Sequence, residues 1–161
     1  MNEPTTCQTR GLRSQSGAAL VEFALVLPLF LLLLLGMFDF GKVFNYWIDG
    51  THLSHEGARY AAVGKNPGPG GTLAESIKQR ADTSELRNGG SSVTATGVRV
   101  CVGFPLGTSQ VGDPVEVNVE FTYRFLNYVT AMTPDLTSTT VTNKSTMRIE
   151  REPTFTAHCT A

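Results

Sequence analysis

The feature that most constrains this chain is a run of apolar residues near its N-terminus. Between Ala18 and Phe38, 18 of the 21 residues are apolar, and residues 31–35 are consecutive leucines. A helix of this length spans roughly 31 Å at 1.5 Å per residue, which matches the hydrocarbon core of a bilayer, about 30 Å thick. Five adjacent leucines leave no polar face for water, so the core helix of a soluble protein fits less well. The run predicts one membrane-spanning helix over 18–38.

A cleaved secretory signal is the main alternative for this run. Such a signal has an apolar stretch of about 7–15 residues with a small-x-small cleavage site after it. Here the run is longer, and it is followed by Gly36-Met37-Phe38-Asp39-Phe40, a poor site for signal peptidase. A retained membrane anchor therefore fits better than a signal peptide.

The charges that flank the run set the expected orientation. The leader, residues 1–17, carries Arg10 and Arg13 against Glu3, and no basic residue follows the run until Lys42. The positive-inside rule therefore places the N-terminus in the cytoplasm and residues 39–161 outside.

The composition of the remaining chain excludes several classes of protein. Outside the run, 48 of 140 residues are apolar, which is enough for one small core. That is too little for a polytopic membrane protein or a multi-domain enzyme. The chain has 13 basic and 14 acidic residues, so it lacks the basic excess of a typical nucleic-acid binder. One membrane segment with one small domain remains.

Aromatic residues cluster just where the helix would leave the bilayer: Phe38, Phe40, Phe44, Tyr46 and Trp47. Such a cluster is typical of the aromatic belt at a membrane interface. The alternative is that the rings pack in the core of the outer domain. Both interpretations can hold for different rings.

The three cysteines are divided by the membrane. Cys7 lies in the leader, whereas Cys101 and Cys159 both lie outside, where thiols are oxidised and paired. Two cysteines allow a single pairing, so we expect a Cys101–Cys159 disulfide. The alternative is that one or both stay free.

Glu22 is the unusual residue of the apolar run. A carboxylate inside a membrane helix is costly, and such groups usually have a partner and a purpose. One interpretation is that Glu22 extends toward the interface. The other is that the chain is cut after Gly17, so that Ala18 carries a new positively charged amine four positions from Glu22 on the same helix face. That amine, in the same chain or a neighbouring one, would supply a counter-ion.

These residues together resemble a known class of sequence. A short basic leader, Gly17, four residues, Glu22, an aromatic residue and a leucine-rich run look like a type IV prepilin-type sequence. The wider stretch 17–28, GAALVEFALVLP, is similar to the TadE-like family, the pseudopilins of the tight-adherence (Tad/Flp) pilus system. The likeness continues in Phe38-Asp39-Phe40-Gly41, in 56–62 and in the ending Met147–Glu150, and it is thin over 65–135.

The resemblance implies a function and a set of partners. A prepilin peptidase would cut between Gly17 and Ala18 on the cytoplasmic face, and Glu22 would serve assembly. The chain would be a non-enzymatic pseudopilin (minor pilin) of a Tad-type pilus, active in pilus assembly and surface adherence. It would reside in the bacterial inner membrane with a periplasmic C-terminal domain. Its partners would be the peptidase, other pilins and pseudopilins, the inner-membrane assembly platform and membrane lipid, with no nucleic acid and no cofactor.

The helix is expected to continue outside the membrane over 39–64. Gly41, Gly50 and Gly57 weaken it, each by about 1 kcal/mol relative to alanine. The Pro- and Gly-rich stretch 66–71 ends it. A second helix is expected after the capping-box pattern Thr72–Glu75, ending at Asn88-Gly89-Gly90.

Beyond this second helix the apolar period changes from 3.6 to 2. Alternation over 98–104, 115–125 and 139–150 predicts three strands, and the link 126–136 contains an apolar patch that suits a short helix. We therefore expect an α+β fold with a long N-terminal helix whose first half is transmembrane. A second helix and a small antiparallel sheet of three or four strands complete the outer domain, 65–161.

The sequence contains no G-x-S-x-G elbow, phosphate loop or dinucleotide fingerprint, and nothing in it looks catalytic. His52, His55 and Glu56 share a helix face, but zinc needs three or four protein ligands and the remaining histidine, His158, lies far away in sequence. A polar helix face is the ordinary explanation, so no metal site is expected. Asp39 is expected either to pair with Lys42, to face a partner helix or to stay exposed at the interface.

Two classes of function remain open at this stage. The first is the processed pseudopilin that the resemblance implies. The second is an unprocessed, signal-anchored periplasmic binding or scaffold module of a secretion apparatus. They differ in the N-terminal residue of the mature protein. A third class, an anchored enzyme, has no residues in its favour.

Overall fold

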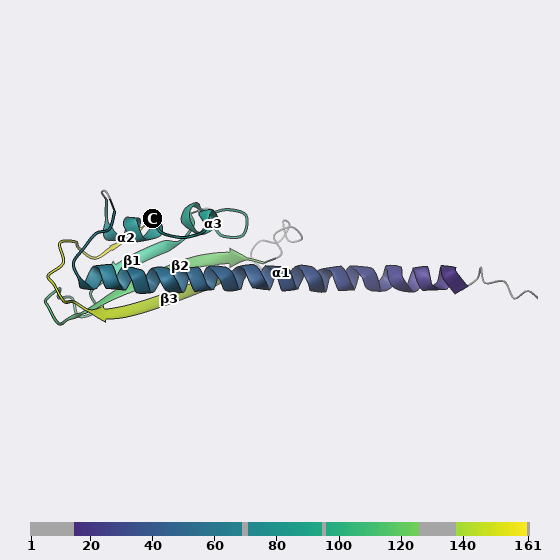
Figure 1. Cartoon of the computed structure of the whole chain (residues 1–161), viewed down its shortest axis with the longest axis horizontal. Helices are drawn as coiled ribbons and strands as arrows, with labels where there is room; N and C mark the ends of the chain where they lie inside the picture. The colour runs from purple at the N-terminus through teal and green to yellow at the C-terminus, as the bar shows by residue number, and fades with distance from the viewer. Residues whose placement is uncertain (1–14, 69–70, 95, 126–137, 161) are drawn as a thin grey trace, which may run out of the picture. The chain divides into compact units, whose positions relative to one another are not determined.

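The computed structural model describes residues 15–68, 71–94, 96–125 and 138–160 (Figure 1). The chain divides into two compact units, Met1–Phe38 and Asp39–Ala161. Helix α1, Gln15–Ala62, contributes residues to both units and includes Pro28 without an interruption of the helix. The expected limits of leader, span and outer domain stay predictions.

Helix α1 ends because Gly64 supplies a left-handed turn, with φ of +66°. The amide of Gly64 donates to the carbonyl of Ala61, and the amide of Lys65 donates to the carbonyl of Tyr60. These two bonds form a Schellman motif, which satisfies carbonyls that the last helical turn leaves open. The helix thus ends at Ala62, two residues before the expected limit at residue 64.

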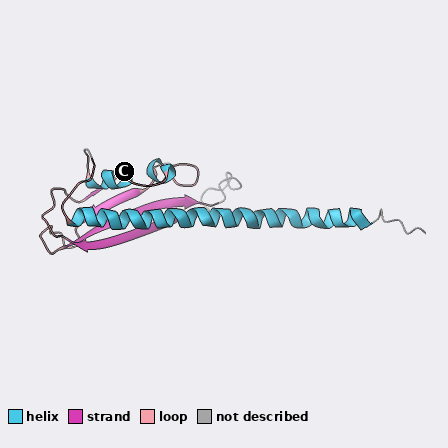
Figure 2. Cartoon of the chain, viewed as in Figure 1, coloured by secondary structure: helices cyan, strands magenta, loops and turns pink. Residues whose placement is uncertain are grey.

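Four strands form one antiparallel sheet in the order β3-β2-β1-β4. Figure 2 shows the longer strands in magenta. Their bounds are Arg99–Gly103 for β1, Pro114–Arg124 for β2, Ser138–Arg148 for β3 and His158–Cys159 for β4. The sheet confirms the α+β prediction. A two-residue strand has no period to detect, so β4 was not located from the sequence. The link 126–136 lies outside the described residues.

Strand β2 confirms the predicted alternation, because every second residue is buried. The buried set is Val115, Val117, Val119, Phe121 and Tyr123. All 11 residues of β2 pair with β3, so this hairpin forms the largest part of the sheet.

The single helix expected after Thr72 is wrong, because the segment forms two short helices. Helix α2 spans Leu73–Lys78 and helix α3 spans Ser84–Asn88. Thr72 caps α2 as the sequence indicates, with its hydroxyl accepting a 3.2 Å hydrogen bond from the amide of Glu75.

Helix α3 begins as a separate helix because side chains accept hydrogen bonds from the backbone amides around its N-terminus. The hydroxyl of Thr83 accepts a hydrogen bond from the amide of Leu86. The carboxylate of Asp49, on α1, accepts hydrogen bonds from the amides of Asp82 and Thr83. A continuous helix would need these amides for its own carbonyls, so the acceptors favour a new N-terminus.

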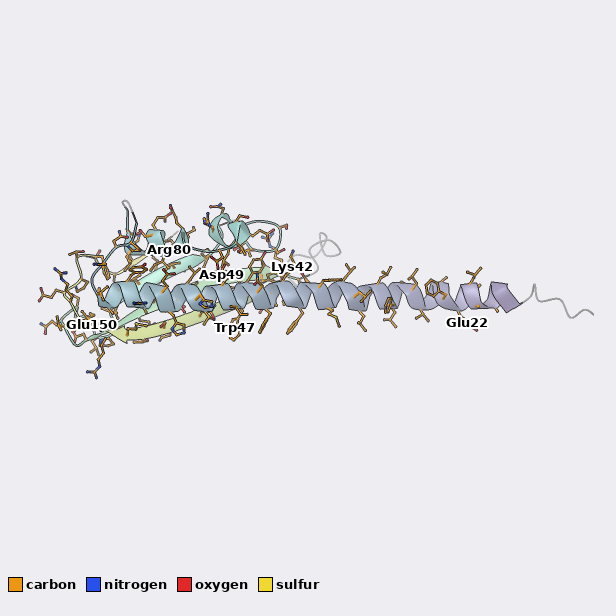
Figure 3. The ribbon with its side chains drawn as sticks, in the orientation of Figure 1. Glu22, Lys42, Trp47, Asp49, Arg80 and Glu150 are labelled. Carbon is orange, nitrogen blue, oxygen red and sulfur yellow. A yellow bond between two sulfur atoms is a disulfide. The ribbon has the colours of Figure 1, made fainter. Side chains whose placement is uncertain are left out.

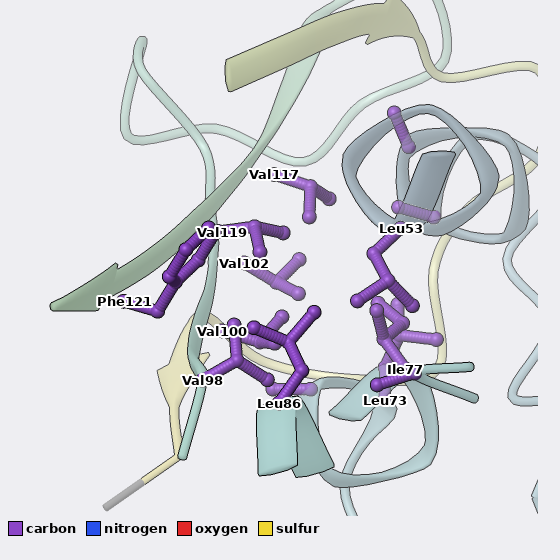
Figure 4. Close-up of a cluster of buried hydrophobic side chains, with 14 of the residues drawn as sticks. Leu53, Leu73, Ile77, Leu86, Val98, Val100, Val102, Val117, Val119 and Phe121 are labelled. Carbon is purple, nitrogen blue, oxygen red and sulfur yellow. The ribbon is translucent and has the colours of Figure 1, made fainter. Parts of the chain in front are cut away.

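The core lies between one face of the sheet and the helices. Figure 4 shows Leu53 of α1, Leu73 and Ile77 of α2 and Leu86 of α3 directed toward the valines of β1 and β2. All four helical side chains are at most 2% exposed. Burying each of them contributes about 1.5–3 kcal/mol.

The face of β3 that points toward α1 is more polar than the predicted alternation of apolar residues over 139–150 implies. Asn143 and Ser145 are buried there, and both contact α1. Asn143 Oδ1 lies 3.1 Å from the hydroxyl of Thr51, and Ser145 Oγ lies 3.1 Å from Nδ1 of His55. Polar contacts therefore join α1 to this edge of the sheet.

Candidate functional site

The predicted processing and assembly residues lie in the first turns of α1. Gly17, Ala18 and Glu22 are exposed, and Figure 3 labels Glu22 on α1. A Cβ added at Gly17 would meet nothing within 4 Å. No hydrogen bond or ion pair joins Glu22 to any residue that the structure describes. The helix that carries these residues is long and apolar enough to cross a membrane, and its most apolar window is 0% buried.

The side of α1 that faces the outer domain carries four polar residues, which we call the polar ladder: Asp39, Lys42, Tyr46 and Asp49. Each contacts a different part of the domain. The hydroxyl of Tyr123 donates to Oδ1 of Asp39 at 2.6 Å, and Lys42 Nζ donates to Oγ of Ser92 at 3.2 Å.

The two C-terminal residues of the polar ladder, Tyr46 and Asp49, contact α3 and the residues just before it. The hydroxyl of Tyr46 donates to Oε2 of Glu85 at 2.9 Å, and the Asp49 carboxylate accepts hydrogen bonds from the amides of Asp82 and Thr83, just before α3. The spacing of the four residues is 3, 4 and 3, so they share one helix face. The ladder therefore fixes the rotation of α1 against the domain.

Burial and hydrogen bonding shift the pKa values of polar-ladder residues and of their partners. Burial first, and then the hydrogen bond to Glu85, raise the pKa of Tyr46 to about 12. Burial raises the pKa of Glu85 in turn, but the hydrogen bonds from Tyr46 and Ser91 outweigh it, so that pKa ends below its usual value. The bond between these two side chains is thus formed by a neutral phenol and a carboxylate at neutral pH.

Two further groups of this network have raised pKa values. Burial raises the pKa of Asp49, although the amides of Asp82 and Thr83 oppose part of that effect. Burial and the neighbouring carboxylate of Asp39 raise the pKa of Tyr123.

The opposite side of α1 leaves large apolar side chains uncovered by the domain. They are Phe40, 66% exposed, Phe44, 51%, Trp47, 48%, and Ile48, 39%. The rings of Phe44 and Trp47 contact each other, with centroids 5.7 Å apart. We call these four residues the aromatic stripe.

The two interpretations of the aromatic cluster, exposure near the membrane interface and packing in the core, thus apply to different rings. Tyr46 is only 7% exposed and packs against Phe121 and Tyr123 in the core. Phe38 is 73% exposed, and the rings of the aromatic stripe are also open. Asp39, for which several partners were considered, contacts Tyr123 of its own chain.

Two of the three residues that suggested a metal face, His55 and Glu56, have other contacts. Nδ1 of His55 contacts Ser145, and Glu56 forms a 2.7 Å ion pair with Arg80. Within the part of the chain that the structure describes, no group of three His, Cys, Asp or Glu side chains is arranged to hold a metal ion.

A disulfide joins Cys101 of β1 to Cys159 of β4. The two residues are direct partners in the antiparallel register, with Cα atoms 4.0 Å apart. Next to them, the amide of Thr160 donates to the carbonyl of Val100, and the Thr160 hydroxyl accepts from the Val100 amide. The disulfide therefore holds the end of the chain on the edge of β1.

Reasoning from the sequence missed the polar ladder as a set. The signal was present, because Asp39, Lys42, Tyr46, Asp49 and Leu53 follow a helical spacing of 3 and 4. Taken one by one, these polar residues indicate no common contact surface, because their partners lie 33 to 84 residues away in sequence.

Comparison with known proteins finds a match for part of helix α1. Residues 17–59 match the family model described as TadE-like protein. The match begins at Gly17 and extends to Arg59, so it includes Glu22, the polar ladder and the aromatic stripe. No curated protein and no solved structure matches the chain.

Proposed function

We propose, with residues 17–59 as a TadE-like segment, that this chain is a non-enzymatic pseudopilin of a Tad-type pilus. A prepilin peptidase cuts it between Gly17 and Ala18, and the mature protein takes part in pilus assembly and surface adherence. Its other partners are pilins and pseudopilins of the same system and the inner-membrane assembly platform. The outer domain stands in the periplasm until the subunit is assembled.

The observation that carries this proposal is Glu22, an exposed carboxylate with no partner among the described residues, on a helix that is otherwise apolar. A carboxylate at the centre of a membrane helix costs about 2.5–3.5 kcal/mol, and less near its end. The apolar run outweighs that cost, so insertion does not require Glu22. Cleavage after Gly17 creates the amine of Ala18, and that amine, most simply on a neighbouring subunit, pairs with the carboxylate.

The second support is Gly17 itself. Apart from its own helical turn, a Cβ added at this position would meet no atom of the described residues within 4 Å. Packing among the described residues therefore does not explain a glycine there, whereas a peptidase that closes around the chain requires a small residue.

The first experiment measures the intact mass and N-terminal residue of the protein extracted from membranes. We expect a chain that begins at Ala18. Gly17→Leu should retain the leader, and Gly36→Leu, at an equally open position of the same helix, should be processed normally. A mature N-terminus beyond Phe38 would favour signal peptidase, and an intact leader in the parent protein would favour the unprocessed periplasmic scaffold.

The second experiment tests assembly. Glu22→Gln and Glu22→Ala should insert and be processed, because neither change makes the helix less apolar. Both should co-purify less with other pilus components at equal abundance, because the amine of Ala18 loses its partner. Leu25→Ala, a change at an exposed apolar position of the same helix, is the control. Undiminished association of both Glu22 variants would contradict the role of Glu22.

A further inference from the structure

The Cys101–Cys159 disulfide lies on the face of the sheet that is turned away from the core. Val100 and Val102 of β1 are buried in the core. Cys101 and Gly103 alternate with them along the strand, so these two positions belong to the opposite face. Cys159 is exposed and Cys101 is partly exposed. Exposed disulfides form the class to which labile and regulatory disulfides belong.

A pocket of about 380 Å³ opens beside this disulfide. Both cysteines line the pocket, together with Gly103 of β1 and the β2 residues Glu116 and Asn118. A Cβ added at Gly103 would meet no atom of the described residues within 4 Å, apart from those of its chain neighbours. The absent side chain therefore leaves room in which an incoming thiol can approach the sulfur atoms.

Strand β4 has few attachments besides the disulfide. It has two residues, both paired with β1, and two further hydrogen bonds join Thr160 to Val100. In contrast, all five residues of β1 pair with β2, and all 11 residues of β2 pair with β3. Opening the disulfide therefore frees β4 and leaves the sheet of β1, β2 and β3 in place.

The segment that precedes β4 has an attachment of its own. The ring of Phe155 stacks on the ring of Phe104, with centroids 6.1 Å apart and an interplanar angle of 16°. This contact does not depend on the disulfide, so the freed part is limited to the residues around 158–160. These residues stay close to the edge of β1, and the disulfide can form again without refolding of the domain.

We propose that Cys101–Cys159 is a reversible thiol-exchange site, which controls whether β4 covers the edge of β1. The reductant is an external dithiol. One of its thiolates enters the pocket and attacks Sγ of Cys159, the more exposed of the two sulfur atoms. A mixed disulfide forms, the Cys101–Cys159 bond breaks, and Cys101 leaves with the electron pair as a thiolate.

The second thiol of the dithiol completes the exchange. As a thiolate it attacks its own partner sulfur in the mixed disulfide, and Cys159 leaves as a thiolate. Two electrons have then passed from the dithiol, which becomes a disulfide, to the cysteines of this chain. The amide and the carbonyl of Val100 lose their bonds to Thr160, so the edge of β1 presents open backbone groups. This inference goes beyond the proposed function and depends on the outer unit alone.

The first test measures reduction of the full chain in detergent by dithiothreitol. A Cys7→Ser background leaves the disulfide as the source of all thiols, which are trapped with N-ethylmaleimide and counted by mass. We expect the folded protein to be reduced within about tenfold of the rate in urea, where the disulfide is fully accessible. A larger gap between the two rates would show that the fold shields the disulfide, and it would overturn the proposal.

Filling the pocket tests the route of the incoming thiol. Gly103→Ala and Gly103→Val should slow reduction of the folded protein in that order, the valine variant by about tenfold. Both should react at the parent rate in urea. Thr122→Val is the control, because Thr122 lies on the same face of β2 and does not line the pocket. Equal rates for the folded parent and both Gly103 variants would contradict entry through the pocket.

The attacked sulfur is identified with glutathione, whose single thiol stops at the mixed disulfide once N-ethylmaleimide has trapped the leaving thiolate. Trypsin cuts after Arg124 and Arg151, so the two cysteines fall in different peptides. We expect glutathione on the Cys159 peptide and N-ethylmaleimide on the Cys101 peptide. The reverse distribution would overturn the assignment of Cys159 as the attacked residue.

Hydrogen exchange of the reduced protein tests the release of β4. The amide of Val100 should exchange faster, because it loses the Thr160 hydroxyl. The amide of Val98 is the matched control, because it donates to the carbonyl of Leu86 at 2.7 Å and does not involve β4. Its protection should stay unchanged, and oxidised glutathione should restore protection at Val100. Protection of both amides after reduction, or loss of both, would contradict a local release of β4.

Discussion

The hydroxyl of Tyr123, at the end of β2, donates a 2.6 Å hydrogen bond to Oδ1 of Asp39. Asp39 is the residue that directly follows the apolar run. The sheet is therefore attached to α1 at the first residue of the outer unit, Asp39–Ala161. This contact and the three others of the polar ladder determine which side of α1 faces the domain and, as a consequence, which side stays open as the aromatic stripe.

Tyr123→Phe should lower the stability of the outer domain. The change removes a donor from a part-buried carboxylate, which costs about 1–3 kcal/mol. The measurement is urea unfolding of the full chain in detergent, followed by near-ultraviolet circular dichroism. The control is Thr122→Val, which removes an exposed hydroxyl contact to Thr140 and should change stability by less than about 0.5 kcal/mol. Equal effects of the two variants would contradict the role given to Tyr123.

Alanine should have opposite effects at two glycines of α1. A Cβ at Gly50 would lie 2.5 Å from Nδ2 of Asn143 and 3.1 Å from Cε1 of Phe121, both on buried residues. Overpacking of this kind costs about 1–3 kcal/mol. A Cβ at Gly41 meets nothing, so Gly41→Ala should stabilise the helix by up to about 1 kcal/mol. Thermal unfolding of both variants against the parent measures the sign, and stabilisation by Gly50→Ala would contradict the close approach of α1 to the sheet.

The pair Tyr46–Glu85 should make stability depend on pH at both ends of the scale. The pKa of Tyr46 rises from 10.0 to about 12 on folding. Its contribution is therefore complete below pH 10 and is lost as the pH rises through about 12. The pKa of Glu85 is lowered on folding, so its contribution is present above its unfolded value and is lost as the pH falls through the folded one.

Unfolding midpoints across the pH range, together with tyrosinate absorbance, test this dependence. Tyr46→Phe should reduce the alkaline loss of stability, and Tyr123, whose pKa is also raised, should contribute to the loss that remains. Glu85→Gln should reduce the acid loss. An alkaline profile of Tyr46→Phe that matches the parent would contradict the assignment.

Removal of the disulfide should release the end of the chain from the sheet. Cys101 and Cys159 are 58 residues apart, and a loop of that size corresponds to about 4 kcal/mol in the chain-entropy model. The double variant Cys101→Ser with Cys159→Ser should lose stability of this order. Hydrogen exchange should also accelerate at the amide of Val100, whose acceptor is Thr160. Unchanged protection at Val100 would show that β4 holds without the disulfide.

The sequence predicts the elements of this fold well where a period is long. The 11-residue alternation of β2 repeats often enough to leave one interpretation, and the 21-residue apolar run predicts a long helix, which α1 confirms. The division into α2 and α3 could not be predicted from the segment itself. It depends on Asp49, a residue more than thirty positions earlier, whose carboxylate accepts the amides of Asp82 and Thr83.

The candidate site could likewise be predicted only where its signal is local in sequence. Gly17, Ala18 and Glu22 are recognisable because their signal is local, a glycine and a glutamate in register at the start of an apolar run. The aromatic cluster was equally visible. Its division into Tyr46 on the core side and Phe44 and Trp47 on the open side depends on where the sheet packs, and that contact forms over about 80 to 90 residues of sequence.

Helix α1 is made long before the residues that cover it. Asp39 precedes Tyr123 by 84 residues, and Thr51 precedes Asn143 by 92. At a translation rate of about 5–20 residues per second, the strands that cover the helix are synthesised roughly 5–20 s after it. During that time Asp39, Lys42, Tyr46 and Asp49 keep this face of α1 polar, so the helix does not need to be buried against the sheet before the rest of its domain has been synthesised.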